Sequence, residues 1–405
     1  MDILKIESVS NIKIKIFIII MSPPKKKKRT NTSVQTDLEP INLFDLINSE
    51  NFYEYKDDND NESETETESE DESEWEYKII DQEIKNIDDL ITLGKIYNFE
   101  DKIQYNINLK KLSKLVKPLE KLQSMIGLTN IKQNIVGHII YHLQNLEDGN
   151  NDMLHTVIQG SPGVGKTMLG KILGDIYFNL GILKGNPKKR KRHKIEEPYT
   201  FKIVKRSDLI GKYLGHTAAK TQKVIDECHG GVLFIDEAYS LGNPEGRDSF
   251  SKECIDTLNQ NLTEGKSNFL CIIAGYKNAL ETCFFAYNEG LRRRFTFIYD
   301  IENYTAHELM LIFKKMVFAL NWSIDEKDDI LVKFFKDNYN SFKCFGGDVE
   351  TLFFNCKIEH GKRVFCHPEL KKKLNSEDIK NGFKNFTKNR SIKSKESNLL
   401  HTMYI

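Results

Sequence analysis

Eight consecutive residues carry the clearest chemistry in this 405-residue chain. They match the pattern G-x-x-x-x-G-K-[ST] and are, in order, Gly160, Ser161, Pro162, Gly163, Val164, Gly165, Lys166 and Thr167. Glycines at this spacing allow a tight turn whose backbone N–H groups point at phosphate oxygens, and the lysine can reach the β and γ oxygens. The Thr167 hydroxyl suits Mg²⁺. The pattern therefore predicts a site for ATP and Mg²⁺.

The residues on both sides of this loop support the same interpretation. Residues 155–159 predict a short strand, and the apolar residues after the loop recur at helical spacing: Met168, Leu169, Ile172, Leu173, Ile176 and Leu180. Phosphates in the loop would then lie on a helix N-terminus, where free N–H groups and the helix dipole favour negative charge. A chance glycine turn is the alternative, and the flanking strand and helix argue against it.

A second group of polar residues follows an apolar run. Residues 232–235 are continuously apolar, as expected for a parallel strand that is buried on both faces, and they end in Asp236 and Glu237. Ligands of open α/β sheets lie beyond the carboxyl ends of the strands, so both acids should face the phosphate loop. We expect Asp236 to bind Mg²⁺ and Glu237 to orient the attacking water. The alternative is a polar pair that only caps the strand.

Three arginines, at positions 292–294, stand before another predicted strand at 296–298. They fit a solvated turn. In a ring-forming ATPase this position supplies an arginine finger, which stabilises transition-state charge in the neighbouring subunit. Arg294 is the predicted finger, and Arg293 is the fallback.

The composition of the whole chain limits the number of domains and the kinds of site and partner only broadly. A chain of this length allows two or three domains, and Lys+Arg and Asp+Glu both number 59, so net charge indicates no partner. Seven cysteines without a C-x-x-C pair argue against a disulfide framework or a zinc site, and Cys271 is expected in the core. No run of ~20 apolar residues is present, so no transmembrane helix and no membrane partner are predicted.

The charge is distributed in blocks. Residues 25–29 form a basic run after two prolines and resemble a nuclear-localisation signal, while residues 57–76 form an acidic tract that reads as a spacer or an interaction tail. A basic cluster at 188–194 fits an exposed loop, a contact for nucleic-acid phosphates or a second import signal. These blocks favour a soluble intracellular protein that can enter a nucleus. Met21 could be the true start, with residues 1–20 an extension, or the apolar residues before it form a short strand.

The pattern divides the rest of the chain into regions. Residues 1–76 read as mostly disordered, and residues 77–118 read as a helical linker. Apolar residues from Ile79 to Ile91 suggest one helix, and those from Leu112 to Ile126 suggest another that breaks near Pro118.

The motifs together resemble an AAA+ ATPase, most closely the CbbX/CfxQ subfamily of red-type Rubisco-activase-like proteins. The segments that carry the resemblance span roughly residues 119–385 and are 160–167, 206–209, 211–217, 230–241 (GGVLFIDEAYSL), 274–276, 290–295 and 304–309. The Lys-, Asn- and Ile-rich composition with an acidic tract is also reminiscent of homologues in large DNA viruses.

The resemblance implies an α/β fold. Residues 119–300 would form an αβα nucleotide-binding domain with a five-stranded parallel sheet, residues 301–390 a small all-α lid, and residues 391–405 a tail. It also implies a homo-oligomeric ring, expected to be a hexamer, with ATP at the subunit boundaries. Ile126 and Gly127 would lie against the adenine, and the aromatic pore loop that grips a polypeptide would be Tyr213, Leu214 and Gly215.

Two departures limit what the resemblance implies. Gly275 and Tyr276 stand where a polar first sensor is common, and residues 346–349 lack the arginine of a second sensor; Lys362 and Arg363 are candidates to replace it. The process that the predicted ATP hydrolysis would drive also stays open. A protein-remodelling machine is favoured, and the alternatives are a nucleic-acid motor or loader, which would use the basic residues at 188–194 and 371–395, and an ATP-gated assembly factor.

Overall fold

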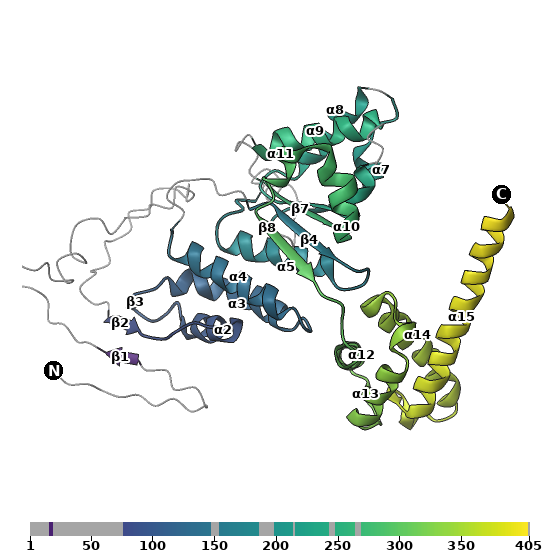
Figure 1. Ribbon diagram of the computed structural model, residues 1–405. Helices are drawn as coiled ribbons and strands as arrows, with labels where there is room; N and C mark the ends of the chain where they lie inside the picture. The colour runs from purple at the N-terminus through teal and green to yellow at the C-terminus, as the bar shows by residue number, and fades with distance from the viewer. Residues whose placement is uncertain are drawn as a thin grey trace, which may run out of the picture. The chain divides into compact units, whose positions relative to one another are not determined.

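The computed structural model describes residues 16–18, 76–146, 154–185, 198–213, 215–242, 248–263 and 269–403 (Figure 1). The chain forms two compact units: Met1–Gln82 with Phe99–Asn106, and Glu83–Asn98 with Ile107–Ile405. The basic run at 25–29, the acidic tract up to residue 75, the basic cluster at 188–194 and Leu214 lie outside the described residues. Nothing in the structure therefore bears on those predictions.

The second unit contains the predicted five-stranded parallel sheet. Its strands are β4 (Thr156–Gly160), β5 (Phe201–Val204), β6 (Val232–Ile235), β7 (Leu270–Gly275) and β8 (Phe297–Ile301), in the spatial order β5-β6-β7-β4-β8. Every residue of β6 and β7 is buried, which explains their continuous apolar sequences. The prediction of this sheet is confirmed.

Helices cover both faces of the sheet. On one face α5 (Lys166–Asn179) packs so closely that a Cβ added to its Gly170 would lie 2.6 Å from the Phe234 ring. On the other face, Leu233 and Ile235 share a core with α8 (His216–Glu227) and α9 (Ser249–Thr263). Alternate residues of β6 thus pack into the cores on the two faces of the sheet, because successive side chains of a strand point to opposite faces.

The remaining helices of the second unit that precede residue 301 are short or lie before the sheet. They are α2 (Ile87–Ile96), α3 (Leu109–Gln123), α4 (Thr129–Leu143), α7 (Arg206–Leu209), η2 (Ala238–Leu241), α10 (Lys277–Ala279), η3 (Leu280–Phe284), η4 (Phe285–Tyr287) and α11 (Glu289–Arg292). All seven cysteines lie in the described residues and are free, and Cys271 is buried in β7 as predicted.

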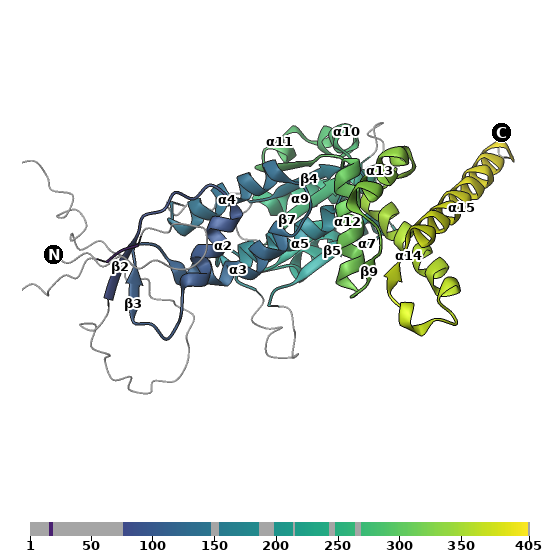
Figure 2. The same ribbon diagram turned by 90° about the horizontal axis from the view of Figure 1, so that it is seen from below.

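The segment after β8 forms the helical lid. It comprises α12 (Ala306–Ala319), α13 (Asp328–Asp337), η5 (Tyr339–Ser341), α14 (Phe345–Arg363), η6 (Pro368–Leu370) and α15 (Ser376–Met403), and α14 packs along α15 (Figure 2). The lid is not purely helical, because β9 (Ser323–Ile324) pairs with β10 (Lys373–Leu374). Helix α15 also continues beyond residue 390, where a tail was expected.

The predicted helix over residues 79–91 is wrong in its first part. Residues Glu76–Ile80 form strand β2, which pairs with β1 (Ile16–Ile18) and β3 (Ile103–Tyr105) in the first unit. The Asn106 side chain binds both the N–H and the C=O of Ile80, which fixes the strand end. Helix α2 begins only after Asn86, whose side chain accepts from the Asp89 N–H in a capping box.

The predicted break at Pro118 is also wrong. Helix α3 continues through this proline, and the predicted domain boundary after residue 118 falls inside the helix. An internal proline costs ~3 kcal/mol. The leucines of α3 at 112, 115, 119 and 122 are fully buried, and each buried leucine contributes about 1.5–3 kcal/mol. Packing therefore outweighs the cost of the proline.

Candidate nucleotide-binding site

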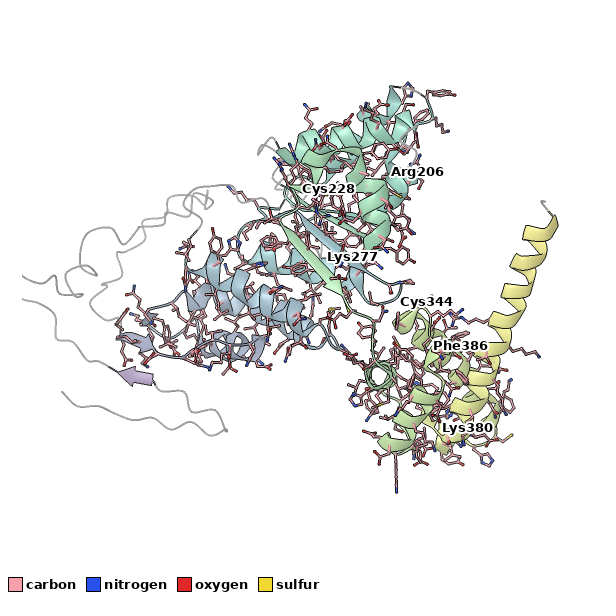
Figure 3. The ribbon with its side chains drawn as sticks, in the orientation of Figure 1. Arg206, Cys228, Lys277, Cys344, Lys380 and Phe386 are labelled. Atoms are coloured by element: carbon pink, nitrogen blue, oxygen red, sulfur yellow. The ribbon has the colours of Figure 1, made fainter. Side chains whose placement is uncertain are left out.

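The phosphate loop has the backbone that its glycines predict. Gly163 and Gly165 have φ angles of +74° and +95°, in the left-handed region, and α5 begins at the next residue, Lys166. A Cβ at Gly163 would lie 2.0 Å from the Cys344 carbonyl oxygen at the start of α14; Cys344 is labelled in Figure 3. Only glycine fits this position, because conformation and space both exclude a side chain.

Segments far away in sequence hold the loop in place. The Tyr304 hydroxyl donates to the Val164 carbonyl at 2.9 Å, and the Ser161 hydroxyl donates to Asn303 Oδ1 at 2.6 Å. The Gly346 N–H donates to the Gly163 carbonyl at 3.1 Å. The sequence had suggested no role for Asn303 or Tyr304. Their position directly after β8 was the available signal, since β8 pairs with the strand that leads into the loop.

Carbonyl groups of the phosphate loop hold the Lys166 side chain. Its ammonium donates to the carbonyls of Gly160 at 2.9 Å and Ser161 at 2.8 Å, and the residue is only 8% exposed. Burial lowers the pKa of Lys166, and the charges of Glu237 and Asp236 oppose that change. The loop and the two acids therefore face one another at the carboxyl edge of the sheet, as their positions after β4 and β6 predicted.

Glu237 has an unusual backbone. Its φ and ψ are +54° and +45°, a left-handed conformation that costs about 1–2 kcal/mol for a residue with a Cβ. The ladder bond from the Asp236 N–H to the Val204 carbonyl and the bond from the Ser240 N–H to the Glu237 carbonyl hold it there. Burial raises the pKa of Glu237, and the charge of Asp236 raises it further. Such strain gathers at functional sites, and here it lies at a residue whose charge acts on Lys166 of the loop.

Tyr276 completes the site at the end of β7. The Lys166 ammonium lies 5.5 Å from the centre of its ring, and the ring also packs against Tyr239 at 5.5 Å. Tyr276 is 38% exposed, so one side of the ring remains open. The sequence left its role open. The structure shows an aromatic face over the lysine, an arrangement that attracts a cation.

The comparisons with known proteins agree with this geometry. The model of the ATPase family associated with various cellular activities (AAA) matches residues 156–303. A CfxQ-like protein of Acanthamoeba polyphaga mimivirus is 44% identical over 324 residues, which cover 79% of this chain and 76% of that protein. The chain belongs to the CfxQ-like AAA ATPases. It is therefore a nucleotide-binding ATPase, and the predicted resemblance, including the viral one, is confirmed.

Other relatives are more distant. The CfxQ homologue of Galdieria sulphuraria is 34% identical over 243 residues, which cover 58% of this chain and 74% of that protein. Among solved structures, the AAA domain of FIGL-1 in complex with ADP has a TM-score of 0.45 at 17% identity, and the match covers 64% of this chain and 82% of that one. In the described part of this CfxQ-like ATPase, no helix is long and apolar enough to cross a membrane.

The turn predicted to face the adenine lies next to the phosphate loop. Ile126 and Gly127 are half-buried, and the methyl group of the preceding residue, Met125, would be 3.2 Å from a Cβ at Gly165. A carboxylate oxygen of Glu308 lies 2.6 Å from the Cβ position of Gly127, so this glycine is also crowded. The adenine contact of this CfxQ-like ATPase stays a prediction.

The three arginines before β8 differ in their surroundings. Arg292 forms an ion pair with Glu281, and Arg294 donates to the carbonyl of Gly290. Arg293 is exposed, and its guanidinium has no partner among the residues that the structure describes. Arg294, the predicted finger, is therefore already bonded within its own chain, while the fallback Arg293 is exposed to solvent.

Lys362 and Arg363 do not replace the missing sensor arginine. Lys362 pairs with Glu359 at 2.6 Å, and Arg363 pairs with the buried Asp378 at 2.8 Å. Both stand at the end of the 19-residue helix α14, whose first residues touch the phosphate loop. At 1.5 Å per residue, the two ends are about 27 Å apart. The suggestion of a substitute sensor at these positions is wrong.

Tyr213 lies on the loop between α7 and α8. It is 68% exposed, its carbonyl accepts from the His216 N–H at 3.1 Å, and its ring meets the His216 ring edge-on at 5.6 Å. Gly215 turns the chain with a φ of +82° before α8. An exposed aromatic side chain on a short turn is available for contact with another molecule.

Proposed function

We propose that this CfxQ-like ATPase hydrolyses ATP with Mg²⁺ as a homo-oligomeric ring and uses the energy to remodel a protein. The observation that carries the proposal is the convergence of Lys166, Asp236 and Glu237 at one edge of the sheet. The strained backbone of Glu237 and the glycine loop with its positive φ angles support a role of this edge in charge stabilisation.

The residues of the phosphate loop and the two acids fit ATP and Mg²⁺, the two groups that the proposed reaction requires. Thr167 and Asp236 supply the oxygen ligands that Mg²⁺ prefers, and Mg²⁺ neutralises charge on the phosphates. Lys166 exchanges its loop carbonyls for phosphate oxygens when ATP binds. Glu237 orients and polarises the attacking water. Ile126 and Gly127 pack against the adenine.

The test of this chemistry is Glu237→Gln. The variant should bind ATP as the native chain does, because the amide keeps the shape of the site, but turnover should fall by about 100-fold or more. Lys166→Ala is the control that should lose binding as well. Hydrolysis by Glu237→Gln at the native rate would show that Glu237 has another role.

The ring requires an arginine from a neighbouring subunit, and we assign it to Arg294 with Arg293 as the fallback. Mixing Arg294→Ala with Lys166→Ala subunits should restore part of the activity, because a finger acts across an interface that pairs one intact finger with one intact loop. The same mixture with Arg293→Ala decides between the two arginines. A monomer in sedimentation with ATP, together with no recovery, would contradict the ring.

The substrate class is assigned from Tyr213, whose exposed ring suits a polypeptide. A pull-down with the Glu237→Gln variant in ATP should capture a protein that is released when ATP is removed. The alternative, a nucleic-acid motor, is favoured by the exposed Lys371, Lys372 and Lys373 of the lid. It predicts DNA or RNA binding that weakens steeply with salt. Capture without any dependence of turnover on the captured molecule would point to the assembly factor.

Nuclear import is part of the proposal and depends on the basic run at 25–29. A fluorescent protein fused to residues 21–40 should concentrate in nuclei. The same fusion with Lys25, Lys26, Lys27 and Lys28 changed to Ala should not. Equal distribution of the two fusions would exclude this signal.

A further inference from the structure

Arg206, the first residue of α7, is labelled in Figure 3, and its guanidinium joins three separate segments. One nitrogen, Nη1, donates to the Ser240 carbonyl at 2.8 Å and to the Ser251 hydroxyl at 2.7 Å. The other, Nη2, donates to Asp248 Oδ2 at 2.5 Å. Ser240 belongs to η2, which begins directly after Glu237. The planar guanidinium therefore links α7 to the segment that carries the catalytic acid and to the start of α9.

Asp248, one of the acceptors of the Arg206 guanidinium, is itself held by several hydrogen bonds. Asp248 Oδ1 accepts the N–H groups of Phe250 and Ser251, and the fully buried Ser251 donates its hydroxyl to Oδ2 at 2.7 Å. Burial by itself raises the pKa of Asp248, but the hydrogen bonds from Ser251 and Arg206 outweigh it and lower the pKa to about 2. The carboxylate thus stays charged at neutral pH, and charge-assisted bonds of this kind are short and strong.

The other end of the link is the loop that presents Tyr213. Helix α7 leads directly into this loop, and Lys220 of α8 donates to the carbonyls of Ser207 at 2.7 Å and Ile210 at 2.9 Å. The Gly211 N–H donates to the Thr217 hydroxyl at 3.1 Å and closes the base of the loop. Helix α7 and the base of the loop are therefore tied together by hydrogen bonds.

The segment that Arg206 holds also touches the nucleotide site. Tyr239 of η2 packs on Tyr276, whose ring lies over Lys166. Lys205, the residue before Arg206, lies near Glu237: burial raises the pKa of that acid, and the charge of Lys205 opposes the rise. The turn between β5 and α7 thus places the charge of Lys205 within electrostatic range of Glu237, and the next residue, Arg206, bonds the segment after that acid.

We infer that Arg206 is a positioning residue that couples the nucleotide site to the Tyr213 loop. Movement of η2 when ATP binds is passed through the Arg206 guanidinium to α7 and then to the base of the loop. This inference rests on the proposed function, because it takes Tyr213 as the group that contacts the substrate. A hydrogen-bonded element that contacts two sites can carry a coupling free energy between them, and η2 with Arg206 is that element.

The test is amide hydrogen exchange of the native full-length chain, with and without Mg²⁺ and a non-hydrolysable ATP analogue. The amides to follow are Gly211 and His216, whose hydrogen bonds close the loop. We expect the nucleotide to change their exchange by about 5-fold or more, the lower end of ordinary allosteric coupling. In Arg206→Lys this nucleotide-dependent change should disappear, while affinity for the analogue is retained. A lysine pairs with Asp248 as a point charge but lacks the planar fork, in which two separate nitrogens hold Asp248 and Ser240 in a fixed arrangement.

Lys220→Met is the matched control. It removes two bonds at the base of the same loop but none to η2, so exchange should rise in both states while the response to nucleotide remains. A purely structural Arg206 would behave like Lys220. A nucleotide-dependent change in exchange in Arg206→Lys that is as large as in the native chain would overturn the coupling. A native loop whose exchange does not change although the analogue is bound would overturn it as well. Both results would leave the proposed ATPase activity intact. A native chain that does not bind the analogue would overturn both proposals.

Discussion

Two loops of this ATPase use positive-φ glycines in opposite ways. The phosphate loop turns at Gly163, with φ at +74°, and the other loop turns at Gly215, with φ at +82°. A Cβ at Gly163 would strike the Cys344 carbonyl at 2.0 Å, whereas a Cβ at Gly215 would meet nothing within 4 Å. The same backbone conformation is thus enclosed in one loop and open in the other.

The difference matches the role that is proposed for each loop. Charge stabilisation in phosphoryl transfer needs donors that are fixed before the reaction, and the phosphate loop is fixed by Tyr304, Asn303 and Gly346. Contact with a varied polypeptide needs an exposed side chain on a loop that can move. The second loop is bonded only at its base in the part that the structure describes, and Tyr213 projects from it.

The strongest way to break this comparison is to add one methyl group to each glycine. In Gly163→Ala the clash with Cys344 should displace the phosphate loop by about 1 Å, and kcat/KM for ATP should fall by about 100-fold. In Gly215→Ala the new methyl group fits, so only the backbone cost of about 1–2 kcal/mol remains. Its ATPase rate should stay near native. Steady-state ATPase assays and thermal unfolding of both variants check these outcomes.

An equal loss of activity in the two alanine variants would show that the left-handed conformation alone matters. The comparison of an enclosed loop with an open one would then fail.

Tyr213→Ala should have a selective effect. Truncating a side chain that is 68% exposed should change the free energy of unfolding by no more than about 0.5 kcal/mol and leave basal ATP turnover unchanged. The increase in turnover caused by a permanently unfolded polypeptide, such as a reduced and carboxymethylated protein, should be lost. Tyr213→Phe keeps the ring and should retain that increase. Retained stimulation in Tyr213→Ala would remove Tyr213 from substrate contact.

The smallest effect concerns pH. Burial and the charge of Asp236 raise the pKa of Glu237 above that of an ordinary glutamate, so the acid loses its proton only at higher pH. A protonated Glu237 cannot polarise water, and the ATPase rate should therefore decline on acidification before an ordinary glutamate would protonate. Lys205→Met removes a charge that opposes the rise, so this acid limb should move to still higher pH. Identical pH profiles of kcat/KM in the native chain and in Lys205→Met would contradict the assignment of the acid limb to Glu237.

Local patterns were enough to predict much of the site. The phosphate loop and the two acids follow buried strands, and parallel strands end at one edge of a sheet, so their meeting followed from the sequence. The N-terminal region was harder. Residues 76–80 are held as a strand by pairing with residues distant in the chain, and α3 continues through Pro118 because buried leucines outweigh a local preference.

The sequence by itself determined the family and the parallel sheet, and it predicted Glu237 as the catalytic acid, since each depends on residues that are close together in the chain. Only the tertiary structure decided which of several similar side chains reaches which site. Arg363 is committed to Asp378 within the lid, whereas Arg206 bonds Ser240, Asp248 and Ser251, which lie 34, 42 and 45 residues away. A guanidinium has the same chemistry at every position, and its role depends on the acceptors that folding brings within about 3 Å.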